Sequence, residues 1–198
     1  MSDSKLQTLK RDLRKSVRIA MCDLAPSQRS EEEDAVNAYA VTYLQQQPKG
    51  TLFAYAAFTP ELNIDPVIEF ALDHGWRVAL PLITSITNGA MELHLMESLT
   101  NLTQGPIDIR QPSPGSATKI DPAEVDFALI PAWAFDRESG ARLGKGAGFY
   151  DRLLATPSWR AETYGIAFRC QLLDNLPVEP HDMQVDGIFT PEGLLRHQ

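Results

Sequence analysis

Apolar side chains recur every three or four positions through the first quarter of the chain, which is the spacing of amphipathic helices. One such stretch covers residues 6–24 and stops before Pro26, because proline removes an N–H and fixes φ. Ser30 and Glu33 have the spacing of a capping box, so we predict that a second helix begins there and continues to Pro48. We expect this second helix to serve only as scaffold.

The pattern then changes to short apolar runs rich in β-branched and aromatic residues, which predict buried strands. A third helix is expected between the first two strands, with Asp65 as its N-cap, Pro66 in its first turn and Gly75 at its end. Strands that alternate with helices over 198 residues predict one α/β domain spanning residues 1–198. The predicted strands cover residues 51–56, 76–80, 91–96, 127–131, 164–168 and 187–190.

Composition and charge narrow the class of partner. The chain has 18 Lys and Arg against 26 Asp and Glu, a net charge of −8 at pH 7, which argues against a nucleic-acid or anionic-membrane surface. Cys22 and Cys170 are too few for a disulfide framework and lack metal-ligand spacing, so we expect reduced thiols. The first residues contain no apolar signal core, and no run approaches the roughly 18 apolar residues of a membrane span. We therefore expect a cytoplasmic monomer with no membrane or nucleic-acid partner.

Three glycines on alternate positions form the least ordinary stretch of the sequence. Gly144, Gly146 and Gly148 follow the predicted strand 127–131 and directly precede a helix expected to begin near Phe149. Without a Cβ the backbone can adopt positive φ, and its N–H groups can converge on a bound anion such as a triphosphate. The alternative is a flexible turn with no ligand, since the spacing matches neither the Walker loop nor the dinucleotide fingerprint.

Charged residues accompany this glycine stretch. Lys145 adds a cation inside it and Arg142 flanks it, while Asp151 supplies a carboxylate that could hold a divalent metal against phosphate oxygens. Lys10 and Arg14 lie four positions apart in the first predicted helix, so their side chains can project to one side and grip one polyanion. From periodicity alone a solvated basic face is the preferred explanation for these two residues.

Glu61 follows the predicted strand 51–56 and so lies at the carboxyl edge of the sheet, where open α/β sheets bind ligands. A solvated loop glutamate is the alternative.

A set of residues between Phe135 and Arg152, which we call the composite, extends beyond the glycines. In its order and spacing it resembles the signature of the 5-formyltetrahydrofolate cyclo-ligase family, also called methenyltetrahydrofolate synthetase. Three positions depart from the signature. Relatives often have glycine in place of Ala147, tyrosine in place of Phe149 and a different residue in place of Lys145. The resemblance runs in the family's order from the basic N-terminal helix to the segment around Asp186. The composite reads Phe135-Asp136-Arg137, Gly140, Arg142-Leu143-Gly144, Gly146, Gly148, Tyr150-Asp151-Arg152.

The resemblance implies a three-layer α/β/α fold with a largely parallel central sheet, and it implies roles for single residues. Lys145 and Arg142 would be catalytic, and Asp151 with Asp186 would hold Mg²⁺, with Asp182 as a neighbour not excluded. The substrate would contact Ala56, Phe58, Glu61, Lys145 and Phe149. ATP would contact Lys10, Arg14, Arg142, Gly144, Lys145, Gly146, Ala147, Gly148, Phe149 and Tyr150.

The implied activity is the ATP-dependent cyclisation of 5-formyltetrahydrofolate to 5,10-methenyltetrahydrofolate with release of ADP and phosphate. Phosphorylation of the formyl oxygen would turn a poor leaving group into a good one, so the protein has to neutralise charge and align its ligands. Two alternatives remain open at this point. One is a non-catalytic folate or nucleotide sensor, and the other is a sugar-phosphate isomerase or CoA-transferase-like enzyme on a similar sheet.

Overall fold

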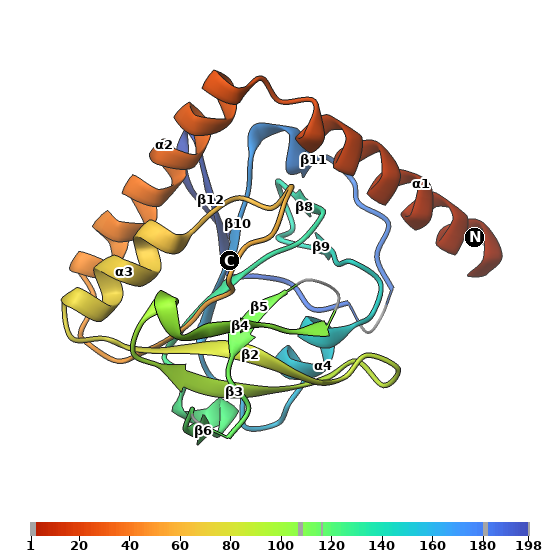
Figure 1. The fold of residues 1–198 in the computed structure, drawn as a ribbon. Helices are drawn as coiled ribbons and strands as arrows, with labels where there is room; N and C mark the ends of the chain where they lie inside the picture. Colours follow the sequence, from red (N-terminus) through yellow and green to blue (C-terminus); the bar gives the residue numbers. More distant parts are fainter. Residues whose placement is uncertain (1–2, 107–108, 116, 180–181, 198) are drawn as a thin grey trace.

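A mixed sheet forms the centre of the computed structural model, which describes residues 3–106, 109–115, 117–179 and 182–197. Within these residues the sheet has eight strands, and the five central ones are parallel (Figure 1). Antiparallel strands extend it at both edges, so the predicted α/β class with a largely parallel sheet is confirmed. The strand order is β13 (Gly193–Arg196), β12 (Gly187–Thr190), β10 (Glu162–Ile166), β7 (Phe127–Ile130), β1 (Thr51–Phe53), β2 (Arg77–Ser85), β3 (Ala90–Met96) and β6 (Lys119–Ile120).

Side chains alternate between the two faces of the sheet, and each face has its own apolar core. Leu52 and Val78 belong to the core shared with the first three helices, whereas Phe53 and Ala79 belong to the core that contains Leu153 of the fourth helix. The sheet is therefore the middle layer of the expected three-layer arrangement. The helices are α1 (Asp3–Cys22), α2 (Pro26–Gln45), α3 (Asp65–Asp73) and α4 (Phe149–Leu154), with short 3₁₀ turns at Leu99–Asn101, Pro122–Glu124 and Arg169–Gln171.

Two predicted helix starts were wrong. α2 begins at Pro26 rather than Ser30, because proline fits the first turn of a helix and Ala25 before it has the extended conformation that proline imposes. α3 includes Asp65, which does not cap it. The Asp65 carboxylate instead accepts from Arg110 at 2.9 and 3.0 Å.

The first predicted strand is shorter than expected, since β1 ends at Phe53 and the buried residues up to Ala56 continue as irregular chain. Several small strands were not predicted at all, because two or three residues show no periodicity. They are β4 (Leu102–Gln104), β5 (Arg110–Pro112), β8 (Ala134–Asp136), β9 (Arg142–Leu143) and β11 (Leu172–Leu173). The edge strands β6 and β13 were not predicted either. No helix in the described part of the chain is long and apolar enough to cross a membrane.

Candidate active site

The glycine stretch is held between a strand and a helix. β9 pairs antiparallel with β8, and the chain then passes through residues 144–148 into α4. Gly146 has φ +108° and Gly148 has φ +68°, values that residues with a Cβ rarely adopt. Gly148 is also the N-cap of α4. The turn into this six-residue helix therefore depends on glycine at these two positions.

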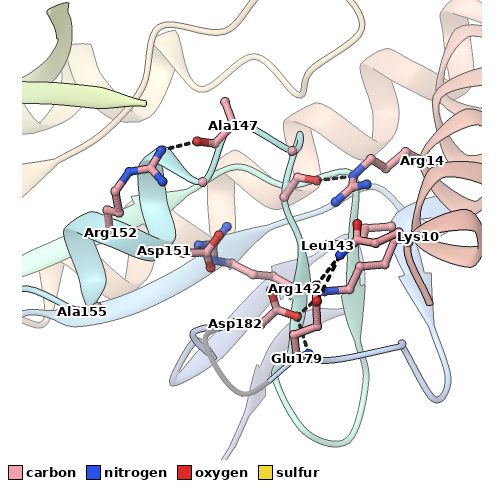
Figure 2. A pocket seen from close by; sticks show the side chains of 14 residues that line it. Lys10, Arg14, Arg142, Leu143, Ala147, Asp151, Arg152, Ala155, Glu179 and Asp182 are labelled. Atoms are coloured by element: carbon pink, nitrogen blue, oxygen red, sulfur yellow. Dashed lines mark hydrogen bonds and ion pairs between the residues drawn. The ribbon is translucent and has the colours of Figure 1, made fainter. Parts of the chain in front are cut away.

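A polar pocket of about 320 Å³ lies between α1 and the glycine loop (Figure 2). Arg14 reaches the loop directly, because its Nε donates to the Gly144 carbonyl at 2.8 Å. The pocket is lined by Gln7, Lys10, Arg14, Arg142, Leu143, Gly144, Gly146, Ala147, Gly148, Asp151, Arg152, Ala155, Glu179 and Asp182.

Lys10 is 3% exposed, so a solvated basic face does not describe it. Its Nζ lies 2.7 Å from Glu179 Oε2 and 2.5 Å from Asp182 Oδ2, as Figure 2 shows. A buried ammonium needs such partners, since the cost of removing it from water is several kcal/mol. The structure thus brings Lys10 and Arg14 to one pocket, with the Lys10 ammonium held by two carboxylates.

An apolar pocket of about 200 Å³ lies on the other side of the glycine loop. Its walls come from the end of β1, the β2–β3 hairpin and the start of α4. The lining residues are Tyr55, Ala56, Phe58, Glu61, Pro81, Ile83, Met91, Ile109, Pro131, Arg142, Gly144, Lys145, Ala147, Gly148, Phe149, Tyr150 and Asp151.

Glu61 and Lys145 form an ion pair inside this apolar pocket. The Lys145 ammonium lies 4.0 Å from the centre of the Phe58 ring, and the Phe58 N–H donates to Glu61 Oε2 at 3.1 Å. The Glu61 side chain is 7% exposed, and burial raises the pKa of Glu61 even though Lys145 opposes that shift. Burial likewise lowers the pKa of Lys145. Each charge is therefore held mainly by the other.

The two pockets share a wall. Arg142 is central to it, with a side chain 1% exposed that donates to Asp151 Oδ1 at 2.6 Å. Burial lowers the pKa of Arg142, and its Nε finds no hydrogen-bond partner among the described residues. A ligand atom on either side of this wall is therefore within reach of a buried guanidinium. The residues common to both pockets are Arg142, Gly144, Ala147, Gly148 and Asp151.

Most of the predicted site residues meet at these two pockets. Lys145 and Phe149, assigned to both ATP and the substrate, line the apolar pocket and not the polar one, and so does Tyr150, which was assigned to ATP alone. Ala56 and Phe58, assigned to the substrate, line the apolar pocket.

Asp186 does not join Asp151. Its carboxylate accepts from the Thr163 N–H at 2.7 Å, at the start of β10, and Asp186 itself precedes β12. Both strands begin there, so Asp186 lies at the amino edge of the parallel sheet, away from the carboxyl edge where the pockets are. The expected Asp151–Asp186 metal pair must be corrected, because the fold separates the two carboxylates.

Asp151 is the carboxylate on the shared wall and the residue whose position fits a divalent cation. One of its oxygens already accepts from Arg142 and from the Met183 N–H at 3.3 Å. No group of three or more His, Cys, Asp or Glu within the described ranges could hold a metal. Mg²⁺ commonly uses one or two carboxylates together with substrate phosphates and water, so Asp151 suits an ion that arrives with a nucleotide.

Sequence reasoning missed several pocket residues. Glu179 contacts Lys10 from a segment with no recognisable pattern, and Asp182, named only as a possible metal-side acid, contacts Lys10 as well. Tyr55, Ile83 and Met91 are apolar-pocket residues that look like ordinary strand residues in the sequence. Arg152 belonged to the quoted composite but received no role. Only Arg152 carried a signal that could have been used.

Comparisons with known proteins show the family of the chain. The model of the 5-formyltetrahydrofolate cyclo-ligase family matches residues 6–191. The 5-formyltetrahydrofolate cyclo-ligase of Escherichia coli K12 is 30% identical over 172 residues, covering 86% of this chain and 94% of the relative, and that of Mycolicibacterium smegmatis is 34% identical over 145 residues, covering 72% and 74%. The solved structure of Aquifex aeolicus 5,10-methenyltetrahydrofolate synthetase has a TM-score of 0.77 at 27% identity, covering 95% of this chain and 92% of its own. The Mycoplasma pneumoniae synthetase has a TM-score of 0.73 at 26% identity, covering 92% and 98%. The chain therefore belongs to the 5-formyltetrahydrofolate cyclo-ligase family of enzymes.

Proposed function

We propose that this protein converts 5-formyltetrahydrofolate to 5,10-methenyltetrahydrofolate with ATP as phosphoryl donor, releasing ADP and phosphate. The observation that carries the proposal is the wall of Arg142, Gly144, Ala147, Gly148 and Asp151 common to a polar and an apolar pocket. A phosphoryl group can pass between two ligands only where their sites touch. Family membership supports the same reaction.

The chemistry needs activation of the formyl oxygen. That oxygen attacks the γ-phosphorus of ATP, and ADP departs. The formyl group on nitrogen 5 then carries the phosphoryl group on its oxygen, as an imidate phosphate. Nitrogen 10 then attacks the formyl carbon, its proton is lost, and the oxygen departs with phosphorus as inorganic phosphate. This path needs no covalent enzyme intermediate, and it asks the protein to hold two ligands in line and to neutralise phosphate charge.

The polar pocket suits the nucleotide. Lys10 and Arg14 supply cations from α1, and glycine-loop N–H groups can donate to phosphate oxygens. Arg142 would stabilise the charge that develops on the transferred group, because its Nε is buried and has no hydrogen-bond partner among the described residues. Mg²⁺ bound at Asp151 would neutralise phosphate charge when present.

The apolar pocket suits the folate. Tyr55, Phe58 and Tyr150 offer aromatic surface to the pterin, and the Glu61 carboxylate can accept from adjacent N–H donors on its guanidine-like edge. The N–H donors would then replace the Lys145 ammonium as the partner of Glu61. Lys145 would become available to the phosphoryl group near the shared wall.

Two measurements test the proposal. Purified protein is mixed with 5-formyltetrahydrofolate, and methenyltetrahydrofolate is followed by absorbance with and without ATP. We expect product only with ATP, whereas binding of both ligands without turnover would indicate a sensor. In the second measurement the formyl oxygen carries heavy oxygen, and mass spectrometry of the released phosphate should find one label per turnover. Label recovered in water would exclude phosphorylation of the formyl oxygen.

A further inference from the structure

Arg152 connects two segments that lie far apart in the sequence. Its Nε donates to the Gly89 carbonyl at 3.1 Å, in the turn between β2 and β3, and its Nη2 donates to the Ala147 carbonyl in the glycine loop. Figure 2 shows the side chain reaching from α4 to Ala147 and away from Lys10 and Arg14. One guanidinium thus fixes the β2–β3 turn against the glycine loop.

The two segments also touch through their backbones. A Cβ added at Gly89 would overlap with both the Ala147 carbonyl oxygen and the Arg152 guanidinium, and φ at Gly89 is +55°. The contact therefore requires glycine at position 89. The same hairpin contributes Ile83 and Met91 to the apolar pocket, while Ala147 lines both pockets.

We propose that Arg152 is a positioning residue, which sets the distance between the β2–β3 hairpin and the glycine loop and so shapes the polar and the apolar pocket together. This proposal rests on the proposed function, because it concerns the sites assigned there to ATP and folate. Charge-assisted bonds to two carbonyls keep Ala147 in the shared wall. Without these bonds the backbone of the glycine loop is no longer held in place, and the apolar pocket loses the wall that Ala147 forms.

Arg152 is exposed, so replacing it empties no core space. The effects of the substitution on Tm and on KM can therefore separate a positioning role from a purely structural one. A structural residue would lower the Tm and the active fraction, but the surviving enzyme would keep its KM values. A residue that bound phosphate directly would raise the KM for ATP alone.

The experiment measures kcat, both KM values and Tm for Arg152→Ala and Arg152→Lys in the full chain. We expect Arg152→Ala to raise the KM for ATP and the KM for 5-formyltetrahydrofolate by about tenfold each, with little change in Tm, since small displacements of positioning groups have effects of this order or larger. Arg152→Lys should be intermediate, because one ammonium cannot reproduce the fork that reaches both carbonyls.

Gly89→Ala disturbs the same contact from the other side and should raise both KM values as well. Gly75→Ala is its matched control, because Gly75 has φ +81° but an added Cβ would meet nothing within 4 Å. Unchanged KM values in Arg152→Ala, or a rise for ATP alone, would overturn the proposal. A wild-type protein that forms no methenyltetrahydrofolate would instead overturn the proposed function.

Discussion

At the scale of single residues, the most informative contact is the ion pair between Glu61 and Lys145. Two charges inside an apolar pocket gain little net stability from each other, because desolvation offsets their attraction. Such a pair is easily exchanged for a ligand that offers the same hydrogen bonds. Under the proposed function, the pair would be the point where a polar edge of the substrate is recognised within an otherwise apolar pocket.

Glu61→Gln keeps the shape of the side chain and removes its charge. We expect affinity for 5-formyltetrahydrofolate to fall by roughly ten- to a hundredfold, the usual effect of losing a hydrogen bond to a charged group. Affinity for ATP should not fall. Calorimetric titration of each ligand alone checks this, and a variant that kept its folate affinity but lost ATP would show that Glu61 serves the nucleotide.

The same carboxylate gives folate binding a pH dependence. Burial raises the pKa of Glu61 above its ordinary value of 4.5, so on acidification it takes up a proton earlier than an exposed glutamate. Affinity should be complete above the raised pKa and should be lost as the pH falls through it. Titrations from neutral pH downward should show this step in the wild type, and Glu61→Gln should lack it.

Asp136 was part of the quoted composite, but its contacts are those of a structural residue. Its two oxygens accept from the N–H groups of Glu138, Ser139 and Leu176 at 2.9 to 3.1 Å and from the Ser139 hydroxyl at 2.8 Å. Burial by itself would raise the pKa of Asp136, but these hydrogen bonds outweigh it and hold the pKa below 3.8. Its stabilisation is thus present above pH 3.8 and is lost as the pH falls through the lowered pKa.

Asp136→Asn should lower the free energy of unfolding by about 2 to 3 kcal/mol at pH 7, because an amide nitrogen would face an N–H donor. Chemical denaturation measures this loss. The KM values of the folded variant should stay unchanged. An altered KM for either ligand would assign Asp136 to the site instead of the fold.

At the scale of elements, the glycine loop depends on its backbone more than on its charges. Gly146 has φ +108°, and the nearest atom to an added Cβ is Arg14 Cζ at 3.9 Å, so space alone would admit a side chain. The constraint is conformational. A β-branched residue there would force the loop out of its present backbone conformation, because it disfavours positive φ.

Gly146→Val should therefore weaken binding of a non-hydrolysable ATP analogue by about a hundredfold or more, since several backbone contacts are lost together. Gly193→Val is the matched control, because Gly193 has φ +130° with nothing within 4 Å of an added Cβ and is the first residue of β13, at the edge of the sheet. Equal losses in both variants would show that the effect is general destabilisation.

The sequence predicted which main segments are helix or core strand, but not all of their bounds. β2, predicted at residues 76–80, is Arg77–Ser85, and α2 begins at Pro26 instead of Ser30. β12 matches its predicted residues, and the stop at Gly75 is borne out by φ +81°. β8 and β9 are too short to show a period, yet their pairing places Arg142 at the shared wall. The metal pair of Asp151 and Asp186 was carried over from the family resemblance, and the structure separates the two because Asp186 directly precedes β12 at the amino edge of the parallel sheet.

At the scale of the whole molecule, the two pockets are not independent. Lys145 is bound to Glu61 on the apolar side, and it stands between Gly144 and Gly146, which line the polar side. A ligand that takes over the Glu61 carboxylate frees a cation beside the phosphate site. Linkage requires that each ligand then tightens the binding of the other by the same factor.

We expect 5-formyltetrahydrofolate to raise the affinity for a non-hydrolysable ATP analogue by about five- to tenfold, at the lower end of typical coupling. Lys145→Met should abolish this increase, because it keeps the side-chain length but removes the charge. Lys15→Met, on the exposed side of α1, should retain it. Titrations with and without folate check all three proteins, and an increase that persists in Lys145→Met would assign the coupling to other residues.

The strand order has a consequence for how copies of this chain meet. The sheet ends in two short antiparallel strands: β6, which has two residues and carries Lys119, and β13, which has four and carries Arg196. If β6 of one copy paired with β6 of another, or β13 with β13, only a few backbone hydrogen bonds would form. The pairing would also bring two Lys119 or two Arg196 side chains close together. Natural proteins use short, charged edges to resist sheet extension from one molecule to the next. The parallel strands that carry the site are thus shielded on both sides from amyloid-like growth, the hazard that accompanies an open sheet.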